Sequence, residues 1–178
     1  VCVGISFIDK EIYLKHLDGN GIGTNRYACY ESWEGGICEG KVDKGTFKLV
    51  ATTSGFILQE PTDQKTLCYF VDKGNYLVRH CGATLPSDRK NLLEVEEVNG
   101  KIYFKLKEAE LKDGEPAYLC ADNSGTGVQT LYKCPKKTGY VTGSISRSTE
   151  WKVELKCSSD EKIENGKCVT IGSCSDDT

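Results

Sequence analysis

Sulfur offers the most evident chemistry in this sequence. Ten cysteines and no methionine occur in 178 residues, and an even cysteine count is typical of a disulfide framework made in an oxidising compartment. Most of the cysteines fall into four short intervals, which leaves one cysteine near each end of the chain. The intervals are Cys29 and Cys38, Cys68 and Cys81, Cys120 and Cys134, and Cys157 and Cys168, and the remaining two are Cys2 and Cys174.

Metal binding and nucleophilic catalysis are the rival uses of cysteine. A structural zinc site needs cysteines two to four residues apart, but five residues separate the nearest pair, Cys168 and Cys174. The only two histidines are His16 and His80, and no G-x-S-x-G motif is present. His80 precedes Cys81, on a strand that we expect to carry a disulfide. We therefore expect no metal, cofactor or catalytic residue, and both histidines on strand or helix surfaces.

Two further patterns resemble functional sites but fit ordinary structure better. Segment 18–23 suggests a calcium loop, yet Ile22 occupies a ligand position and Cys29 stands where the bidentate glutamate belongs, so we expect a glycine-rich turn. Three carboxylates lie close together in the sequence, and they predict a solvated strand face, because a glycosidase needs two carboxylates facing each other across a cleft. They are Glu94, Glu96 and Glu97.

Charge and hydropathy exclude other classes of protein. The net charge of -3 comes from 23 basic and 26 acidic residues that are spread evenly, so the electrostatic footprint of a nucleic-acid-binding protein is missing. No apolar run approaches the length of a membrane helix. The start Val1-Cys2-Val3-Gly4 is typical of a mature end or of a cut from a larger polypeptide. We expect a secreted or cell-surface protein.

Strand patterns dominate the chain. Segments 102–107 and 151–156 alternate apolar and polar residues, and Asn99-Gly100 is a strong two-residue hairpin signal. This turn predicts the cross-strand pairs of the hairpin, with apolar pairs on one face and an opposite-charge pair on the other. The predicted pairs are Val98 with Lys101, Val95 with Phe104, Leu93 with Leu106, and Glu94 with Lys105.

The same counting applies to the cysteine intervals. A turn at 74–75 would place Cys68 directly opposite Cys81, within disulfide reach. A turn at 165–166 would instead place Cys157 opposite Cys174 and leave Cys168 to pair elsewhere, so the fourth pairing stays open. Segment 10–18 fits either a strand or one or two helical turns.

The cysteine intervals also resemble an internal repeat. They open at positions 29, 68, 120 and 157, and an aromatic residue or leucine precedes the first three openings. Such units should stack or share one sheet system. We therefore predict an all-β module over 1–178 with little helix, in which disulfide-stapled β-hairpins form a sandwich- or solenoid-like sheet system. Candidate sub-units are 1–60, 61–115 and 116–178.

Aromatic residues are the candidates for a binding surface. Trp33 lies at the tip of the first cysteine loop beside Glu34, and Tyr30 lies on the same loop. Tyrosine and tryptophan on stapled loops lose little entropy on binding. We predict that Tyr30, Trp33 and Glu34 contact a partner, whereas Trp151 alternates with apolar residues and should belong to the core.

The cysteine unit resembles the repeat modules of large secreted scaffold proteins of anaerobic gut fungi. The likeness lies in 67–69 through 77–81 and in 118–120 through 131–140. It implies a cohesin-like, non-catalytic module that holds cellulase-type enzymes by binding their dockerin domains. The long insert 87–114 departs from an even repeat.

Two functions follow as expectations. The first is a non-catalytic extracellular protein-binding module of a larger scaffold, with dockerin-bearing secreted enzymes of plant-polysaccharide degradation as partners. The alternative is a secreted cysteine-rich effector or protease inhibitor, because the tail 157–168 is similar to small cysteine-rich inhibitor modules.

Overall fold

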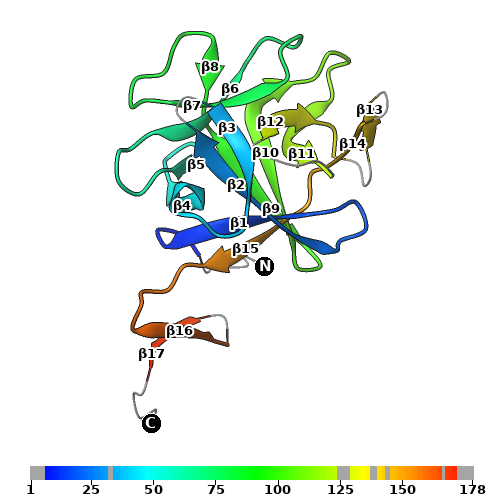
Figure 1. Cartoon of the computed structure of the whole chain (residues 1–178). Coiled ribbons are helices and arrows are strands. Elements are labelled where there is room, and N and C mark those ends of the chain that lie inside the picture. Colours follow the sequence, from blue (N-terminus) through cyan, green and yellow to red (C-terminus); the bar gives the residue numbers. More distant parts are fainter. Residues whose placement is uncertain are drawn as a thin grey trace.

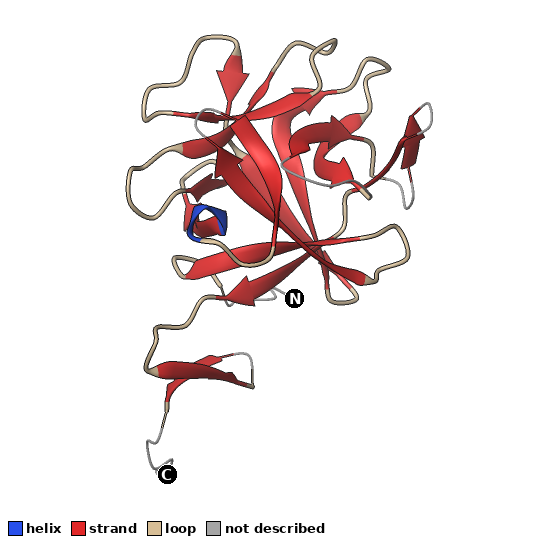
Figure 2. Cartoon of the chain, viewed as in Figure 1, coloured by secondary structure: helices blue, strands red, loops and turns tan. Residues whose placement is uncertain are grey.

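The fold was analysed in a computed structural model of the chain, which describes residues 7–31, 34–123, 129–136, 140–142, 145–165 and 167–171. Within these ranges the regular secondary structure is almost entirely β-strand, joined by turns and loops, and the only helix is a short 3-10 turn, η1 (Asp43–Gly45) (Figure 2). No helix of the described part is long and apolar enough to cross a membrane.

The strands follow one another along the whole described chain. Their bounds are β1 (Glu11–Leu17), β2 (Gly23–Glu31), β3 (Glu34–Glu39), β4 (Thr46–Ala51), β5 (Phe56–Gln59), β6 (Thr66–Phe70), β7 (Leu77–Cys81), β8 (Arg89–Lys90), β9 (Leu93–Val98), β10 (Lys101–Glu110), β11 (Pro116–Asp122), β12 (Gln129–Cys134), β13 (Tyr140–Thr142), β14 (Ile145–Ser148), β15 (Trp151–Leu155), β16 (Glu161–Glu164) and β17 (Lys167–Thr170).

Six of these strands form a closed barrel. The antiparallel pairings run from β1 to β4, β5, β9, β10 and β15, and β15 pairs again with β1. A longer closed path that includes hairpin strands contains ten strands. The prediction of a sandwich or solenoid was therefore wrong. Closure pairs the strand edges that either of those alternatives would leave open.

Three hairpins cap one end of the barrel and reveal a threefold repeat. The hairpins are β2–β3, β6–β7 and β11–β12, and β3, β7 and β12 pair with one another. The chain thus forms three lobes: β1 to β4, β5 to β9, and β10 to β15 (Figure 1). Six barrel strands capped by three hairpins about a pseudo-threefold axis are the arrangement of a β-trefoil.

Each of these hairpins carries one of the predicted disulfides. The bridges Cys29–Cys38, Cys68–Cys81 and Cys120–Cys134 all have Cα–Cα distances of 5.9 Å. All six cysteines are buried. Each bridge links the two strands of its hairpin and thereby restricts the unfolded chain.

The register within the β6–β7 hairpin differs from the prediction. Cys68 lies opposite Arg79, and Thr66 lies opposite Cys81, so the disulfide runs diagonally across the pair. The cause is the turn. The turn is centred one residue earlier than predicted: the Asp72 carbonyl accepts a hydrogen bond from the Asn75 amide at 3.1 Å, and the Asp72 carboxylate accepts one from the Gly74 amide at 2.7 Å. The hairpin at Asn99-Gly100, by contrast, has all four predicted pairs.

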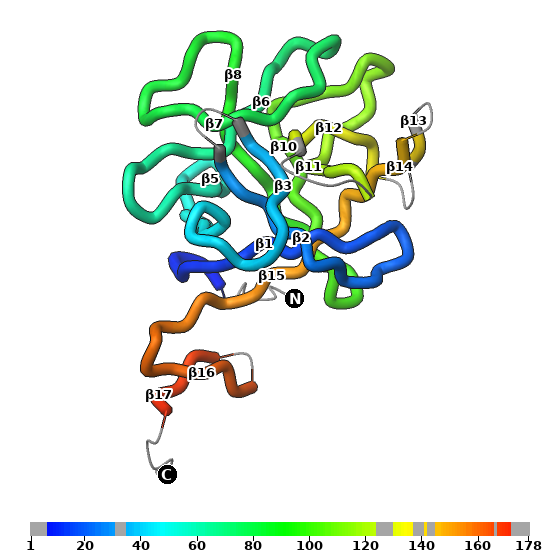
Figure 3. Tube along the Cα trace, in the orientation of Figure 1, coloured from blue at the N-terminus to red at the C-terminus, as the bar shows by residue number. Residues whose placement is uncertain are grey.

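The fourth disulfide lies outside the repeat. Cys157 is bonded to Cys168, and the latter belongs to the separate hairpin β16–β17. Figure 3 shows this hairpin set apart from the barrel. The turn at Asn165 forms as predicted, since Glu164 pairs with Lys167. Cys157, however, precedes β16, so the turn does not set its pairing. Cys2 and Cys174 lie outside the described residues.

The core fills the barrel and the space beneath the cap. Inward positions alternate along the barrel strands, as in β1, where Ile12 and Leu14 are fully buried. Each lobe contributes one large residue at the start of its last strand, namely Phe47, Leu93 or Trp151. Trp151 is fully buried, as predicted, and its indole donates a hydrogen bond to the Leu119 carbonyl at 3.0 Å. The outward positions of the same strands are free to form a surface site.

Candidate functional site

The outward face of β9, β10 and β11 holds a set of polar and aromatic contacts. Alternation points Tyr103 and Lys105 outward from β10, because Ile102 and Phe104 point into the core. The register places Tyr103 opposite Glu96 and Lys105 opposite Tyr118. Three adjacent strands thereby gather side chains that are far apart in the sequence.

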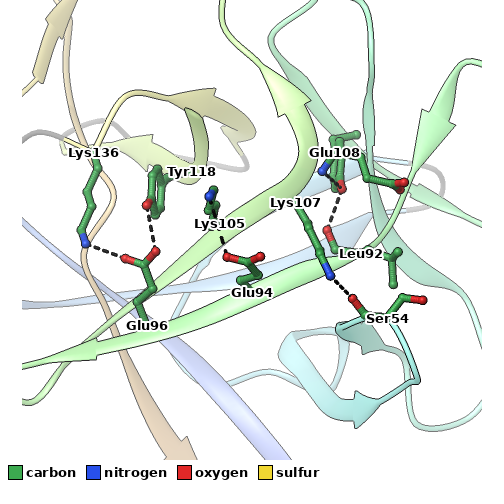
Figure 4. Close-up of polar contacts among 10 residues, drawn as sticks. Ser54, Leu92, Glu94, Glu96, Lys105, Lys107, Glu108, Tyr118 and Lys136 are labelled. Atoms are coloured by element: carbon green, nitrogen blue, oxygen red, sulfur yellow. Dashed lines mark hydrogen bonds and ion pairs between the residues drawn. The ribbon is translucent and has the colours of Figure 1, made fainter. Parts of the chain in front are cut away.

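Two side chains converge on the carboxylate of Glu96, as Figure 4 shows. The Tyr118 hydroxyl donates a hydrogen bond to Glu96 Oε1 at 2.9 Å, and Lys136 Nζ donates to Glu96 Oε2 at 2.5 Å. Lys136 Nζ also lies 4.6 Å from the ring centroid of Tyr103 and 5.5 Å from that of Tyr118. We call Glu96, Tyr103, Tyr118 and Lys136 the flank cluster.

The electrostatics of the flank cluster keep the carboxylate charged. Burial alone would raise the pKa of Glu96, but the hydrogen bonds from Lys136 and Tyr118 outweigh it and hold this pKa below its usual range. Burial and the hydrogen bond to Glu96 raise the pKa of the Tyr118 hydroxyl to about 12. At neutral pH the cluster is thus a carboxylate, an ammonium and two neutral phenols.

Further charges border the flank cluster. Glu94 and Lys105 form an ion pair at 3.8 Å, visible in Figure 4. On the other side, the Tyr103 hydroxyl lies 3.3 Å from Glu150 Oε2, and Lys101 Nζ donates to the same oxygen at 2.7 Å. The surface therefore alternates positive and negative groups around two tyrosine rings. The prediction that Glu94, Glu96 and Glu97 form only a solvated face misses the role of Glu96.

The arrangement suits binding better than catalysis. Both Glu96 oxygens already accept hydrogen bonds, and its lowered pKa makes it a poor general acid at neutral pH. An ammonium held against ring faces and a carboxylate is the geometry by which proteins recognise cations. Among the described residues, no group of three or more Asp, Glu, His or Cys side chains could hold a metal ion.

The predicted partner-binding residues lie elsewhere. Tyr30 is half-buried in β2, where its ring packs on Phe47 and His80 with centroids 5.5 and 5.1 Å apart. It lines a pocket of about 490 Å³ together with residues of β1, the loop at Asp43 and Pro61. Trp33 lies outside the described residues.

The third predicted residue, Glu34, opens β3, where its backbone pairs with Arg79. Its side chain lies outside what the structure describes. The structure therefore describes one of the three predicted side chains, that of Tyr30, and this side chain is not part of the flank cluster.

The two histidines correct another prediction, because both are buried and neither lies on a surface. His16 is fully buried, stacks near Trp151 and places Nε2 3.0 Å from the Ser148 carbonyl oxygen. His80 lies beneath Tyr30, with Nδ1 3.1 Å from Oε1 of Glu60, which is also buried. Alternation alone does not reveal this, since each histidine occupies an inward position where an apolar residue is the usual choice.

Part of the flank cluster can be recognised in the sequence. Tyr27 and Tyr118 both stand two residues before the first cysteine of a pair, and the β10 pattern places Tyr103 and Lys105 on one face. The lysine that completes the cluster comes from a loop, where no periodicity applies. No family model matches the chain, and no curated protein is significantly similar to it.

Proposed function

We propose that the chain is a non-catalytic extracellular protein-binding module of a larger scaffold, and that it docks dockerin-like domains of secreted enzymes that degrade plant polysaccharide. The observation that carries this proposal is the flank cluster, in which Glu96 and Tyr103 on barrel strands and Lys136 on a loop are partly exposed around the buried Tyr118. Tyrosine and charged pairs at the rim are the usual materials of protein interfaces.

Rigidity supports the same proposal. Glu96 and Tyr103 stand on two paired barrel strands, Tyr118 stands on the adjoining cap strand β11, and three buried disulfides hold the cap. Groups that are already ordered lose little entropy when a partner binds. Four disulfides also suit an oxidising compartment outside the cell.

Capture from a secreted mixture of plant-cell-wall-degrading enzymes tests the proposal. The immobilised, correctly oxidised chain should retain dockerin-bearing enzymes. Glu96→Gln should weaken this capture, because it removes the charge that meets Lys136 and the partner. Glu97→Gln is the matched control, since it removes the same charge one residue further along the same strand. An empty eluate from the oxidised chain would refute the proposal.

The alternative function, a secreted effector or protease inhibitor, is favoured by one feature. The hairpin β16–β17 projects from the barrel, is stapled by Cys157–Cys168 and exposes half of the Ile163 side chain (51%) (Figure 1). A stapled, exposed hairpin suits a bait segment. Stoichiometric inhibition of a panel of secreted proteases, lost on Ile163→Asp, would support this function over the scaffold module.

A further inference from the structure

The flank cluster spans the lobe boundary between β9 and β10, and it has a counterpart at the lobe boundary between β15 and β1. Strands β15, β1 and β2 repeat the register of β9, β10 and β11. In both sets the middle strand carries a tyrosine that faces a glutamate of the first strand, and two residues later it carries a lysine that faces a tyrosine of the third strand. The matched cross-strand pairs are Glu154 with Tyr13 and Glu96 with Tyr103, then Lys15 with Tyr27 and Lys105 with Tyr118.

The contacts repeat as well. The Tyr27 hydroxyl donates a hydrogen bond to Glu154 Oε1 at 2.6 Å, as Tyr118 does to Glu96. Lys41 Nζ lies 3.8 Å from Glu154 Oε1 and 5.5 Å from the Tyr13 ring centroid, as Lys136 does in the flank cluster. The two lysines come from loops after the second cysteine of their lobes, but at different distances from it, three residues after Cys38 and two after Cys134.

The fold does not require this arrangement. At the equivalent positions between β4, β5 and β6, Val50 lies opposite Ile57 and Gln59 lies opposite Thr66. The second lobe therefore joins the same barrel and carries the same disulfide-stapled hairpin without tyrosine, glutamate or lysine at these positions. The tyrosine, glutamate and lysine residues at these positions are therefore not needed for the barrel to fold.

The repeated chemistry is that of an ammonium-binding cage. Each site consists of two tyrosine rings and one carboxylate. In one of them Lys136 Nζ lies over both rings, whereas in the other Lys41 Nζ lies over Tyr13 and Lys15 Nζ lies 5.9 Å from the Tyr27 ring centroid. We call Tyr13, Tyr27 and Glu154 the first cage, and Tyr103, Tyr118 and Glu96 the second cage. Rings and a carboxylate around a cation are how proteins recognise alkylammonium groups. The loop lysines show which ligand the cages accept.

We propose that both cages are recognition sites for lysine side chains of a protein partner, and that Lys41 and Lys136 occupy them in its absence. This proposal rests on the proposed protein-binding function and identifies the partner's chemistry. A partner that presents two lysines engages both cages at once, and this bivalent binding gives a higher affinity than either cage gives alone. Each loop lysine then competes with the partner for its cage.

The competition is weak enough to be overcome. The ion pairs and the cation–π contacts are partly exposed, and such contacts are individually weak. Lys41 is the looser occupant, because its ammonium lies farther from the carboxylate than that of Lys136 and its side chain is 44% exposed. The first cage therefore opens more readily than the second.

Titration with Nα-acetyl-lysine methylamide tests the proposal, with the ring resonances of Tyr13 and Tyr103 followed by NMR. Lys41→Ala should tighten binding at the first cage by about fivefold, and Lys136→Ala should tighten binding at the second by about tenfold, because each removes the internal competitor. Lys112→Ala, which removes an exposed lysine from a turn outside both cages, should change nothing. Glu154→Gln and Glu96→Gln should each abolish binding at their own cage.

The proposal is decided by whether Lys41→Ala and Lys136→Ala raise or lower the affinity for the probe. If Lys41→Ala and Lys136→Ala bind the probe no better than the unmodified chain, or if the probe with an acetylated side-chain nitrogen binds equally well, the cages are not lysine sites. If the probe behaves as expected but enzyme capture yields nothing, the cages stand and the proposed partner class fails. If capture succeeds without any tightening of probe binding, the lysine proposal alone fails.

Discussion

Replacing Glu60 with glutamine should remove a loss of stability that the folded protein undergoes between pH 6.5 and pH 8. Glu60 and His80 are 3% and 1% exposed, with Oε1 and Nδ1 3.1 Å apart. Burial raises the pKa of Glu60 to about 8, helped by a hydrogen bond with Asp63, and burial lowers the pKa of His80 to about 3. The positive charge of Lys65 acts against the first shift and adds to the second.

The magnitude follows from counting protons. In the unfolded chain the carboxyl titrates near 4.5 and the imidazole near 6.5. Between pH 4.5 and pH 6.5, Glu60 and His80 together hold one proton in the folded chain and one proton in the unfolded chain. The free energy of unfolding therefore does not change with pH in this range through these two groups. Above pH 6.5 the unfolded pair holds none of these protons, while the folded pair keeps one until about pH 8.

A raised carboxyl pKa contributes stability that is lost as pH rises through the folded value. One proton corresponds to about 1.4 kcal/mol per pH unit, so the free energy of unfolding should fall by about 2 kcal/mol across this window.

Urea unfolding at constant ionic strength, followed by the fluorescence of buried Trp151, measures this free energy at each pH. The unmodified chain should lose stability from pH 6.5 to pH 8, and Glu60→Gln should keep it, because the amide does not titrate. Asp63→Asn is a useful control, since it removes a neighbouring charge while leaving the buried carboxyl in place. A flat profile in the unmodified chain, or an equal slope in Glu60→Gln, would refute the reasoning.

Three further predictions concern other buried and stapled groups. Lys133→Ala should lower the free energy of unfolding by about 2–3 kcal/mol in urea, because the buried ammonium donates to two backbone carbonyls of the β6–β7 connection at 2.7 and 3.0 Å. Mild reduction should open Cys157–Cys168 first, since Cys168 is partly exposed while the three hairpin bridges are buried. Alkylation of the released thiols followed by mass spectrometry identifies the cysteines that react first, and simultaneous alkylation of all cysteines would contradict this prediction. Burial lowers the pKa of His16 to about 4, so stability should fall from pH 6.5 towards pH 4, and His16→Gln should flatten that limb.

Local rules were sufficient for part of the fold. A two-residue turn at Asn99-Gly100 leaves one register, and the structure has every pair that it implies. The diagonal bridge at Cys68 and Cys81 was not predictable in the same way, because the turn is centred one residue earlier than the assumed turn at 74–75. Closure into a barrel depends on pairings such as β15 with β1, which join the two ends of the described barrel and have no local signal.

The candidate site also combines features that local sequence rules predict with features that only long-range pairing produces. Alternation predicts that Tyr103 and Lys105 share a face, and the repeat places Tyr27 and Tyr118 at matching positions. What brings Glu154 to Tyr13 is a pairing between strands more than 130 residues apart, and what brings Lys41 and Lys136 to the rings is loop geometry. Neither has a periodicity that can be read from the sequence.

Partner binding by the two cages is tested most directly by calorimetric titration of the oxidised chain with an enzyme recovered by capture. The double variant Glu96→Gln, Glu154→Gln should lose at least about tenfold in affinity while unfolding within a few degrees of the unmodified chain, and Glu97→Gln should bind normally. Undiminished affinity in the double variant would contradict the assignment of the partner site to the barrel flank.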